Sequence, residues 1–105
     1  MSTGGRSKNK LNKFIAFRNY GLFYRVGGED LILLHYLLNI NIKNEFGYIY
    51  KDNIDKVLLV LDKLNINYLF NKEYYNFENN QYDYYLEYAY KKYDLYLIIN
   101  GVYHD

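Results

Sequence analysis

Carboxylates are the residues of this chain whose spacing first suggests chemistry. Glu29 and Asp30 directly follow Gly27 and Gly28, and a pair of carboxylates of this kind can bind a cation together with phosphate oxygens. A strand that ends at the glycines and a helix that begins at the acids would explain the same four residues, because carboxylates stabilise helix N-termini. The spacing favours this structural role over a catalytic one.

The other reactive residue types are few and widely separated. His35 lies within an apolar segment and His104 lies near the end of the chain, which is a poor arrangement for a metal site. Ser2 and Ser7 are the only serines, so no folded element positions a serine nucleophile. Cysteine is absent, and no glycine-rich loop leads into a Lys-Ser or Lys-Thr pair that could bind phosphates. We therefore predict a binding protein that is not an enzyme and uses no cofactor or metal.

Composition narrows the class of protein further. A chain of 105 residues, half of them hydrophobic, is long enough for one globular domain. The net charge of +1 creates no overall field that would attract nucleic acid. The 16 tyrosines are consistent with an AT-rich coding sequence, and they also suit contact surfaces. The absence of a membrane-length apolar run, of a secretory signal and of cysteine predicts a cytoplasmic protein.

Hydrophobic periodicity divides the chain into strands and helices. Short apolar or alternating runs predict strands at 14–17, 22–26, 40–42, 46–50 and 66–70, with a possible hairpin arm at 74–77. Helical spacing predicts helices from Glu29 to Asn39, from Asp52 or Asn53 to Asn65, and over 81–99. The order predicts a single α/β domain over residues 13–105, with a mixed, mostly antiparallel sheet, about three helices and a long C-terminal helix. Residues 1–12 are predicted to be a flexible basic leader.

The last predicted helix carries tyrosines around most of its circumference. One stripe is expected in the core, formed by Tyr82, Leu86, Ala89, Tyr93 and Leu97. Aromatic residues that remain exposed beside cations can anchor a protein partner or stack on bases. The predicted partner-binding residues on this surface are Tyr84, Tyr88, Lys91 and Lys92.

The order of several short motifs resembles the N-terminal, mismatch-recognition domain of MutS-type DNA mismatch repair proteins. The similar pieces are residues 22–27, the acidic pair Glu29-Asp30, the step over 37–42, and residues 47–50 followed by a helix over 53–64 and a strand from Ile66. The resemblance implies a mixed sheet flanked by helices and an association with DNA. That family reads a mismatch with a Phe-x-Glu motif just after the strand glycine. Here Gly28, Glu29, Asp30 and Leu31 follow Gly27, so no residue takes over those roles.

Two functions from different classes follow. The first is a stand-alone relative of that domain, a non-catalytic nucleic-acid-associated binding module. Its predicted phosphate contacts are Arg6, Lys8, Lys10, Lys13, Arg18 and Arg25, and its predicted stacking residues are Tyr20 and Tyr24. The alternative is a small protein-interaction factor, such as a phage or mobile-element inhibitor of a host nucleic-acid enzyme, acting or self-associating through its tyrosine-rich surface. A basic face with aromatic residues would favour nucleic acid, whereas a neutral tyrosine patch on the last helix would favour a protein partner.

Overall fold

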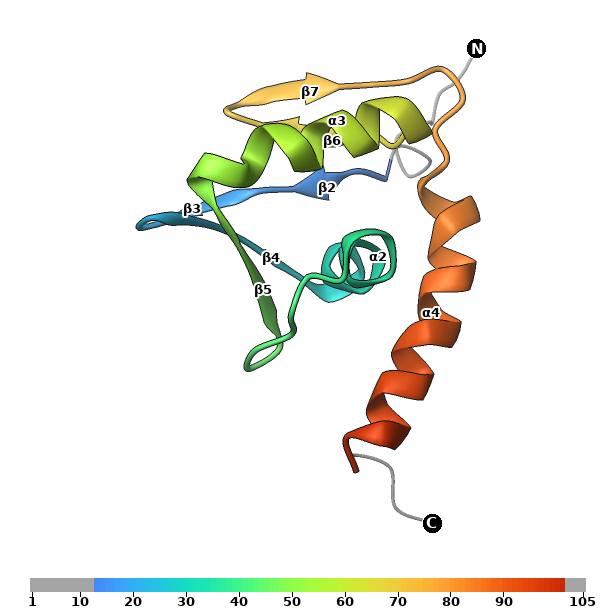
Figure 1. Cartoon of the computed structure of the whole chain (residues 1–105). Coiled ribbons are helices and arrows are strands. Elements are labelled where there is room, and N and C mark those ends of the chain that lie inside the picture. Colours follow the sequence, from blue (N-terminus) through green and yellow to red (C-terminus); the bar gives the residue numbers. More distant parts are fainter. Residues whose placement is uncertain (1–12, 102–105) are drawn as a thin grey trace.

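The computed structural model describes residues 13–101 as a mixed α/β fold (Figure 1). Its strands are β2 (Ile15–Ala16), β3 (Arg18–Tyr20), β4 (Phe23–Gly27), β5 (Phe46–Tyr50), β6 (Tyr68–Phe70) and β7 (Glu73–Tyr75). Its helices are α2 (Gly28–Leu38), α3 (Ile54–Leu64) and α4 (Tyr82–Ile99), with a 3-10 turn η1 (Lys51–Asn53) before α3. The predicted class, with its long last helix, is confirmed. The predictions for residues 1–12, including Arg6, Lys8 and Lys10, and for His104 lie outside the described residues.

The strands form two three-stranded sheets, where the sequence had suggested a single sheet. One sheet has the order β2-β6-β7, with β2 parallel to β6 and β6 antiparallel to β7. The other has the order β3-β4-β5 and is antiparallel throughout. Phe17 is the only residue between β2 and β3, and its N–H donates to the Leu69 carbonyl at 3.3 Å. The chain therefore passes from one sheet directly into the other.

Asparagine marks the turns and helix ends of this fold. Asn39 and Asn65 end α2 and α3 in the left-handed conformation, with φ of 57° and 58°, and both helix ends were predicted. Asn44 and Glu45 form a two-residue turn in which Lys43 and Phe46 exchange backbone hydrogen bonds of 2.7 and 3.0 Å. Both central residues have positive φ, as a type I′ turn requires. Since asparagine tolerates this conformation better than other non-glycine residues, its position in the sequence sets these turns.

Glu45 is the strained member of its turn, because its φ of 71° costs a non-glycine residue about 1 kcal/mol. We expect Glu45→Gly to raise the free energy of unfolding by up to about 1 kcal/mol, the gain being reduced by the greater freedom of glycine in the unfolded chain. Urea denaturation measures the change. Glu45→Ala removes the carboxylate but keeps the Cβ, so it should give no gain. Equal stabilisation by both variants would attribute the effect to charge and contradict the explanation by backbone strain.

The predicted strand at 40–42 is wrong. Residues 39–42 have no regular structure, and Lys43 forms only an isolated bridge with Phe46. Ile40 and Ile42 alternate with polar residues because both are half-buried against the core. The His35 ring nitrogen Nδ1 lies 3.0 Å from the Ile40 carbonyl oxygen. The His35 side chain of α2 thus bonds to the Ile40 carbonyl, a backbone group that would pair with a neighbouring strand if residues 40–42 formed one.

One hydrophobic core joins the two sheets and the three helices. Its fully buried members include Ile15, Val26, Leu33, Leu34, Leu61, Ile66 and Ala89. α2 packs closely on the inner face of the β3-β4-β5 sheet, because a Cβ added to Gly47 would lie only 2.5 Å from Leu31 Cδ1. α4 contacts the other side of α2 (Figure 1). The predicted α4 stripe is confirmed at Tyr82, Leu86 and Ala89, which are buried. Among the described residues, no helix has the length and apolar character needed to span a membrane.

Candidate nucleic-acid interface

The register of the β3-β4-β5 sheet places all of its aromatic residues except Tyr24 on the side turned away from the core. Residues directly opposite one another in an antiparallel pair share a face, and the pairs include Tyr20 with Phe23, Phe23 with Tyr50, and Arg25 with Tyr48. Val26 and Ile49 lie on the opposite face and are buried. We call the outer surface the aromatic face. It consists of Tyr20, Phe23, Phe46, Tyr48 and Tyr50 with Arg18 and Arg25.

The rings of the aromatic face contact one another across the strands and remain accessible. The centroids of Tyr20 and Tyr48 are 5.4 Å apart, and Phe23 lies 6.1 Å from Tyr48 and 5.6 Å from Tyr50. The exposed fractions of Tyr20, Phe23 and Tyr50 are 49%, 37% and 43%. Large apolar side chains gathered on one exposed sheet face are typical of a binding surface.

Arg25 is built into this surface. Its guanidinium carbon lies 4.8 Å from the ring centroid of Tyr20 and 4.3 Å from that of Phe46, so cation–π contacts hold it between two rings. Gly27 makes room for the Phe46 ring, since a Cβ there would lie 3.0 Å from Phe46 Cε1. Arg18 pairs with Arg25 in the register and is exposed. The three strands contain no acidic residue, so the local charge of the face is positive.

Two neighbouring hollows lie on this face and share the same two rings. The first has a volume of about 460 Å³ and is lined by Tyr20, Phe23, Asn41, Lys43, Asn44 and Tyr48. The second has a volume of about 420 Å³ and is lined by Tyr20, Gly21, Leu22 and Phe23 at the tip of the β3-β4 hairpin. Both hollows are open to solvent, the second more than the first.

Two of the residues predicted to bind nucleic acid lie elsewhere. Tyr24 points to the opposite side of the sheet, where its ring lies 5.2 Å from Phe70 and Lys51 Nζ lies 5.2 Å from its centroid. Lys13 forms ion pairs with Glu29 at 3.5 Å and with Asp83 at 3.2 Å. Among the described residues that were predicted to bind nucleic acid, the fold brings together Arg18, Tyr20 and Arg25.

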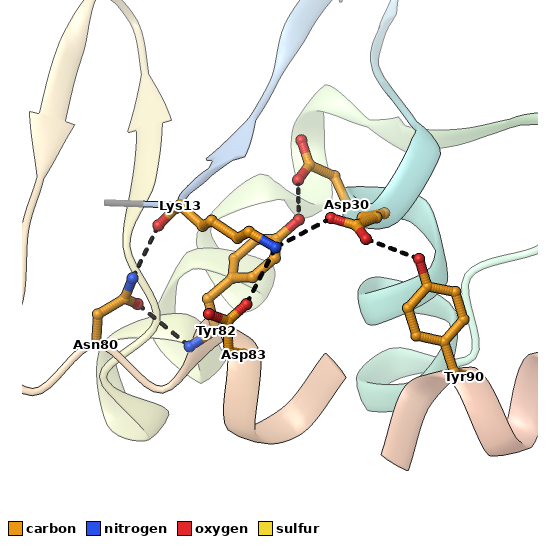
Figure 2. Close-up of polar contacts among 7 residues, drawn as sticks. Lys13, Asp30, Asn80, Tyr82, Asp83 and Tyr90 are labelled. Carbon is orange, nitrogen blue, oxygen red and sulfur yellow. Dashed lines mark hydrogen bonds and ion pairs between the residues drawn. The ribbon is translucent and has the colours of Figure 1, made fainter. Parts of the chain in front are cut away.

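The acidic pair forms a structural junction between β2, α2 and α4 (Figure 2). Tyr82 donates its hydroxyl proton to Asp30 Oδ1 at 2.5 Å, and the backbone N–H of Ala16 donates to Asp30 Oδ2 at 3.0 Å. Tyr90 donates to Glu29 at 2.7 Å. These bonds connect three elements far apart in the sequence. Glu29 and Asp30 lie in the first turn of α2, as their spacing predicted, whereas their tertiary hydrogen bonds were not predicted from the sequence.

Burial changes the acidity of this junction. Removal from water raises the pKa of the Asp30 carboxyl above its usual value, although the bonds from Ala16 and Tyr82 oppose the rise. Burial and the neighbouring Asp30 charge raise the pKa of the Tyr82 hydroxyl, which therefore stays protonated as the donor. The Asp83 carboxylate raises the pKa of Lys13, which keeps the ammonium charged.

The raised pKa of Asp30 predicts an unusual dependence of stability on pH. A carboxyl whose folded pKa lies above its unfolded value binds more protons in the folded state, so its contribution to stability falls as pH rises between those two values. We expect the stability of Asp30→Asn relative to wild type to improve from about pH 4 to pH 7. Urea denaturation at several pH values measures it, with Asp55→Asn, an exposed carboxyl, correcting for the loss of one charge. An advantage that shrinks with rising pH would contradict the assignment.

The predicted partner surface on α4 is only partly assembled. Tyr84 and Tyr88 are exposed, with centroids 5.5 Å apart, and Lys91 Nζ lies 5.6 Å from the Tyr88 ring. Lys92 is directed elsewhere, because its ammonium donates to the His35 carbonyl at 3.2 Å and to the Asn39 side chain. It ties α4 to the end of α2.

Four residues of the aromatic face were not predicted from the sequence as candidate site residues: Phe23, Phe46, Tyr48 and Tyr50. The alternation of Phe46, Tyr48 and Tyr50 was recognised as a half-buried strand, but periodicity does not say which of two faces meets solvent. Aromatic residues are usually expected in the core, but in β5 the small residue Gly47 faces the core and the aromatic residues lie on the other face. A glycine alternating with aromatic residues was the one available signal.

Across residues 13–101, no group of three or more histidine, cysteine, aspartate or glutamate side chains is arranged to hold a metal ion. The comparisons with known proteins found no matching family model, curated protein or solved structure. Function is therefore inferred from the geometry of the aromatic face itself.

Proposed function

We propose that this protein is a non-catalytic, nucleic-acid-associated binding module that contacts its ligand through the aromatic face. The observation that carries the proposal is the gathering of five aromatic rings and two arginines on one exposed sheet surface whose strands contain no acidic residue. Aromatic rings stack on bases and arginines contact phosphates, so the two residue types together suit nucleic acid. The resemblance of short sequence motifs to the N-terminal domain of MutS proteins implied the same class of ligand, but no family model matches the chain, so the proposal depends on the aromatic face alone.

The charge distribution supports the same proposal. The chain as a whole is nearly neutral, so binding would depend on local charge and stacking more than on a general basic field. Arg18 and Arg25 lie on the aromatic face, and Lys43 lies on the rim of its larger hollow. These cations supply two or three phosphate contacts. Affinity should therefore depend on salt, with a slope of log K against log salt of roughly −1.4 to −2.1 for a single strand.

Fluorescence anisotropy of labelled single-stranded, matched and mismatched DNA, measured at low and moderate salt, tests the proposal. We expect Arg18→Glu to weaken binding and to reduce the size of the salt slope by roughly 0.7 or more, because a phosphate contact is lost. Lys56→Glu makes the same charge change at an exposed position of α3 and should have little effect. Absence of binding at low salt would reject the proposed function, and equal losses in both variants would reject the proposed face.

A second function is favoured by a different surface. Tyr84 and Tyr88 of α4 are 53% and 42% exposed, and Leu95, Ile98 and Ile99 are exposed further along the same helix. Such a patch suits a protein partner or self-association, as expected of a small inhibitor of a host enzyme. Sedimentation of the protein alone tests self-association. Replacement of Tyr84 and Tyr88 would then reduce assembly without changing DNA binding.

A further inference from the structure

We infer that the ligand of the aromatic face is single-stranded nucleic acid, with one unpaired base held in the larger hollow between Tyr20, Phe23 and Tyr48. The inference rests on the proposed function and specifies its ligand. Three rings from three adjacent strands bound this hollow, and they are set at 50° to 75° to one another where they touch. Because the rings contact one another, a flat ring that enters this open hollow would stack on one of its walls rather than between two of them.

An unpaired base fits this geometry better than a base pair. In a duplex, both faces of each base are covered by its neighbours, so side chains can stack only on a base that has left the stack. The hollow of about 460 Å³ is open to solvent and is lined by side chains of two hairpins and of the link between α2 and β5. Along a duplex, the grooves would offer the rings only base edges and backbone atoms. Stacking on the ring faces therefore selects for single strands.

The rim supplies polar groups suited to a base edge and a phosphate. Asn41, Lys43 and Asn44 line the hollow opposite the rings, and each asparagine amide offers both a donor and an acceptor. Asn44 is held in place by the type I′ turn, in which its φ is 51°. Within the part of the chain that the structure describes, Asn41, Lys43 and Asn44 form no side-chain hydrogen bond or ion pair with another residue. Their polar atoms face the hollow's occupant or water.

The position of the second hollow indicates the path of the bound nucleic-acid strand. It lies at the β3-β4 hairpin tip and shares Tyr20 and Phe23 with the first hollow. Tyr20 and Phe23 can therefore contact two successive bases, one in each hollow. Successive bases that stack on aromatic side chains are typical of proteins that bind single strands. The strand would run from the Asn44 turn across Phe23 to Leu22. Few cations lie along this path, which suits a single strand, whose phosphates are less densely spaced than those of a duplex.

Fluorescence anisotropy with labelled oligonucleotides of about ten bases tests the inference. The probes are a thymine strand, an adenine strand and a longer duplex of the same two sequences, about 25 base pairs, which stays paired at the strand concentrations of the assay. We expect single strands to bind at least about tenfold more tightly than the duplex. Phe23→Leu removes the shared ring and should lower single-strand affinity by about 5- to 150-fold. Tyr84→Leu makes a ring-to-leucine change on α4 and serves as the matched control, and thermal unfolding verifies that each variant is folded.

Asn44→Gly separates recognition of the base edge from stacking, because glycine keeps the positive φ of the turn but removes the amide. We expect it to change the ratio of the affinities for the two single strands. Duplex binding that equals or exceeds single-strand binding, with Phe23→Leu unaffected, would overturn the inference while leaving the proposed function intact. Binding of neither form by the wild-type protein would reject both.

Discussion

Replacing Tyr82 with alanine should lower the free energy of unfolding by about 3–5 kcal/mol, as expected for deleting a large buried ring. Tyr82 is 3% exposed and lies at the first turn of α4, where its hydroxyl also bonds to Asp30. The loss would affect two interactions at once, the packing of α4 and the hydrogen bond to the half-buried Asp30 carboxylate. Because domains of this size are stable by only about 5–15 kcal/mol, the variant should be close to unfolding at moderate temperature.

Tyr82→Phe separates the two contributions. It keeps the ring but removes the hydroxyl, so it should cost only the bond to the carboxylate, about 1.5–3 kcal/mol. Urea denaturation at neutral pH measures both variants, with Tyr84→Ala as a control at an exposed position of the same helix, where we expect a change within about 0.5 kcal/mol. A negligible effect of Tyr82→Phe would show that the hydroxyl does not hold the junction of β2, α2 and α4 together.

Replacing Tyr20 and Tyr48 together with leucine should lower affinity for single-stranded DNA by at least about 30-fold. Each base stacked on an aromatic side chain contributes about 1–3 kcal/mol, so the loss of two rings costs about 2–6 kcal/mol of binding free energy. Leucine keeps much of the apolar bulk, and Arg25 keeps its contact with Phe46. The fold should therefore survive, which far-ultraviolet circular dichroism verifies.

The matched control is the double change Tyr84→Leu and Tyr88→Leu, which replaces two tyrosines of α4, both exposed. We expect it to leave DNA affinity within about twofold of wild type, since surface changes away from a site usually have small effects. If the α4 pair reduced binding more than the sheet pair, the nucleic-acid surface would lie on the helix and the aromatic face would lose its assigned role. Anisotropy at one fixed salt concentration allows the comparison, because neither double variant changes charge.

Several parts of the fold could be read from local sequence because they depend on neighbouring residues alone. The ends of α2 and α3 were predicted from Asn39 and Asn65, whose side chains tolerate the left-handed conformation that both adopt. The buried start of α4 was predicted from helical spacing, and Tyr82, Leu86 and Ala89 are buried. The strand predicted at residues 40–42 is wrong, because Ile40 and Ile42 alternate with polar residues but pack against the core from a segment without regular structure.

The candidate site depended on contacts between residues far apart in the chain. Arg18, Tyr20 and Tyr24 lie within seven positions of one another, yet the register of β3 with β4 puts the first two on the outer face and Tyr24 on the inner face. Lys13 and Lys92 looked like exposed cations, but tertiary contacts with Glu29 and with the His35 carbonyl occupy them.

By itself, the sequence determined the α/β class, the places where α2 and α3 end, and the absence of cysteine. These properties follow from composition and from short-range backbone preferences. Only the tertiary structure decided that Phe23, Tyr48 and Tyr50 face outward beside Arg25, and that the half-buried Asp30 accepts a hydrogen bond from Tyr82. The physical reason is that period-2 alternation defines two faces of a sheet without saying which one a helix will cover. Here α2 covers the face of Val26, Gly47 and Ile49, which leaves the aromatic face exposed.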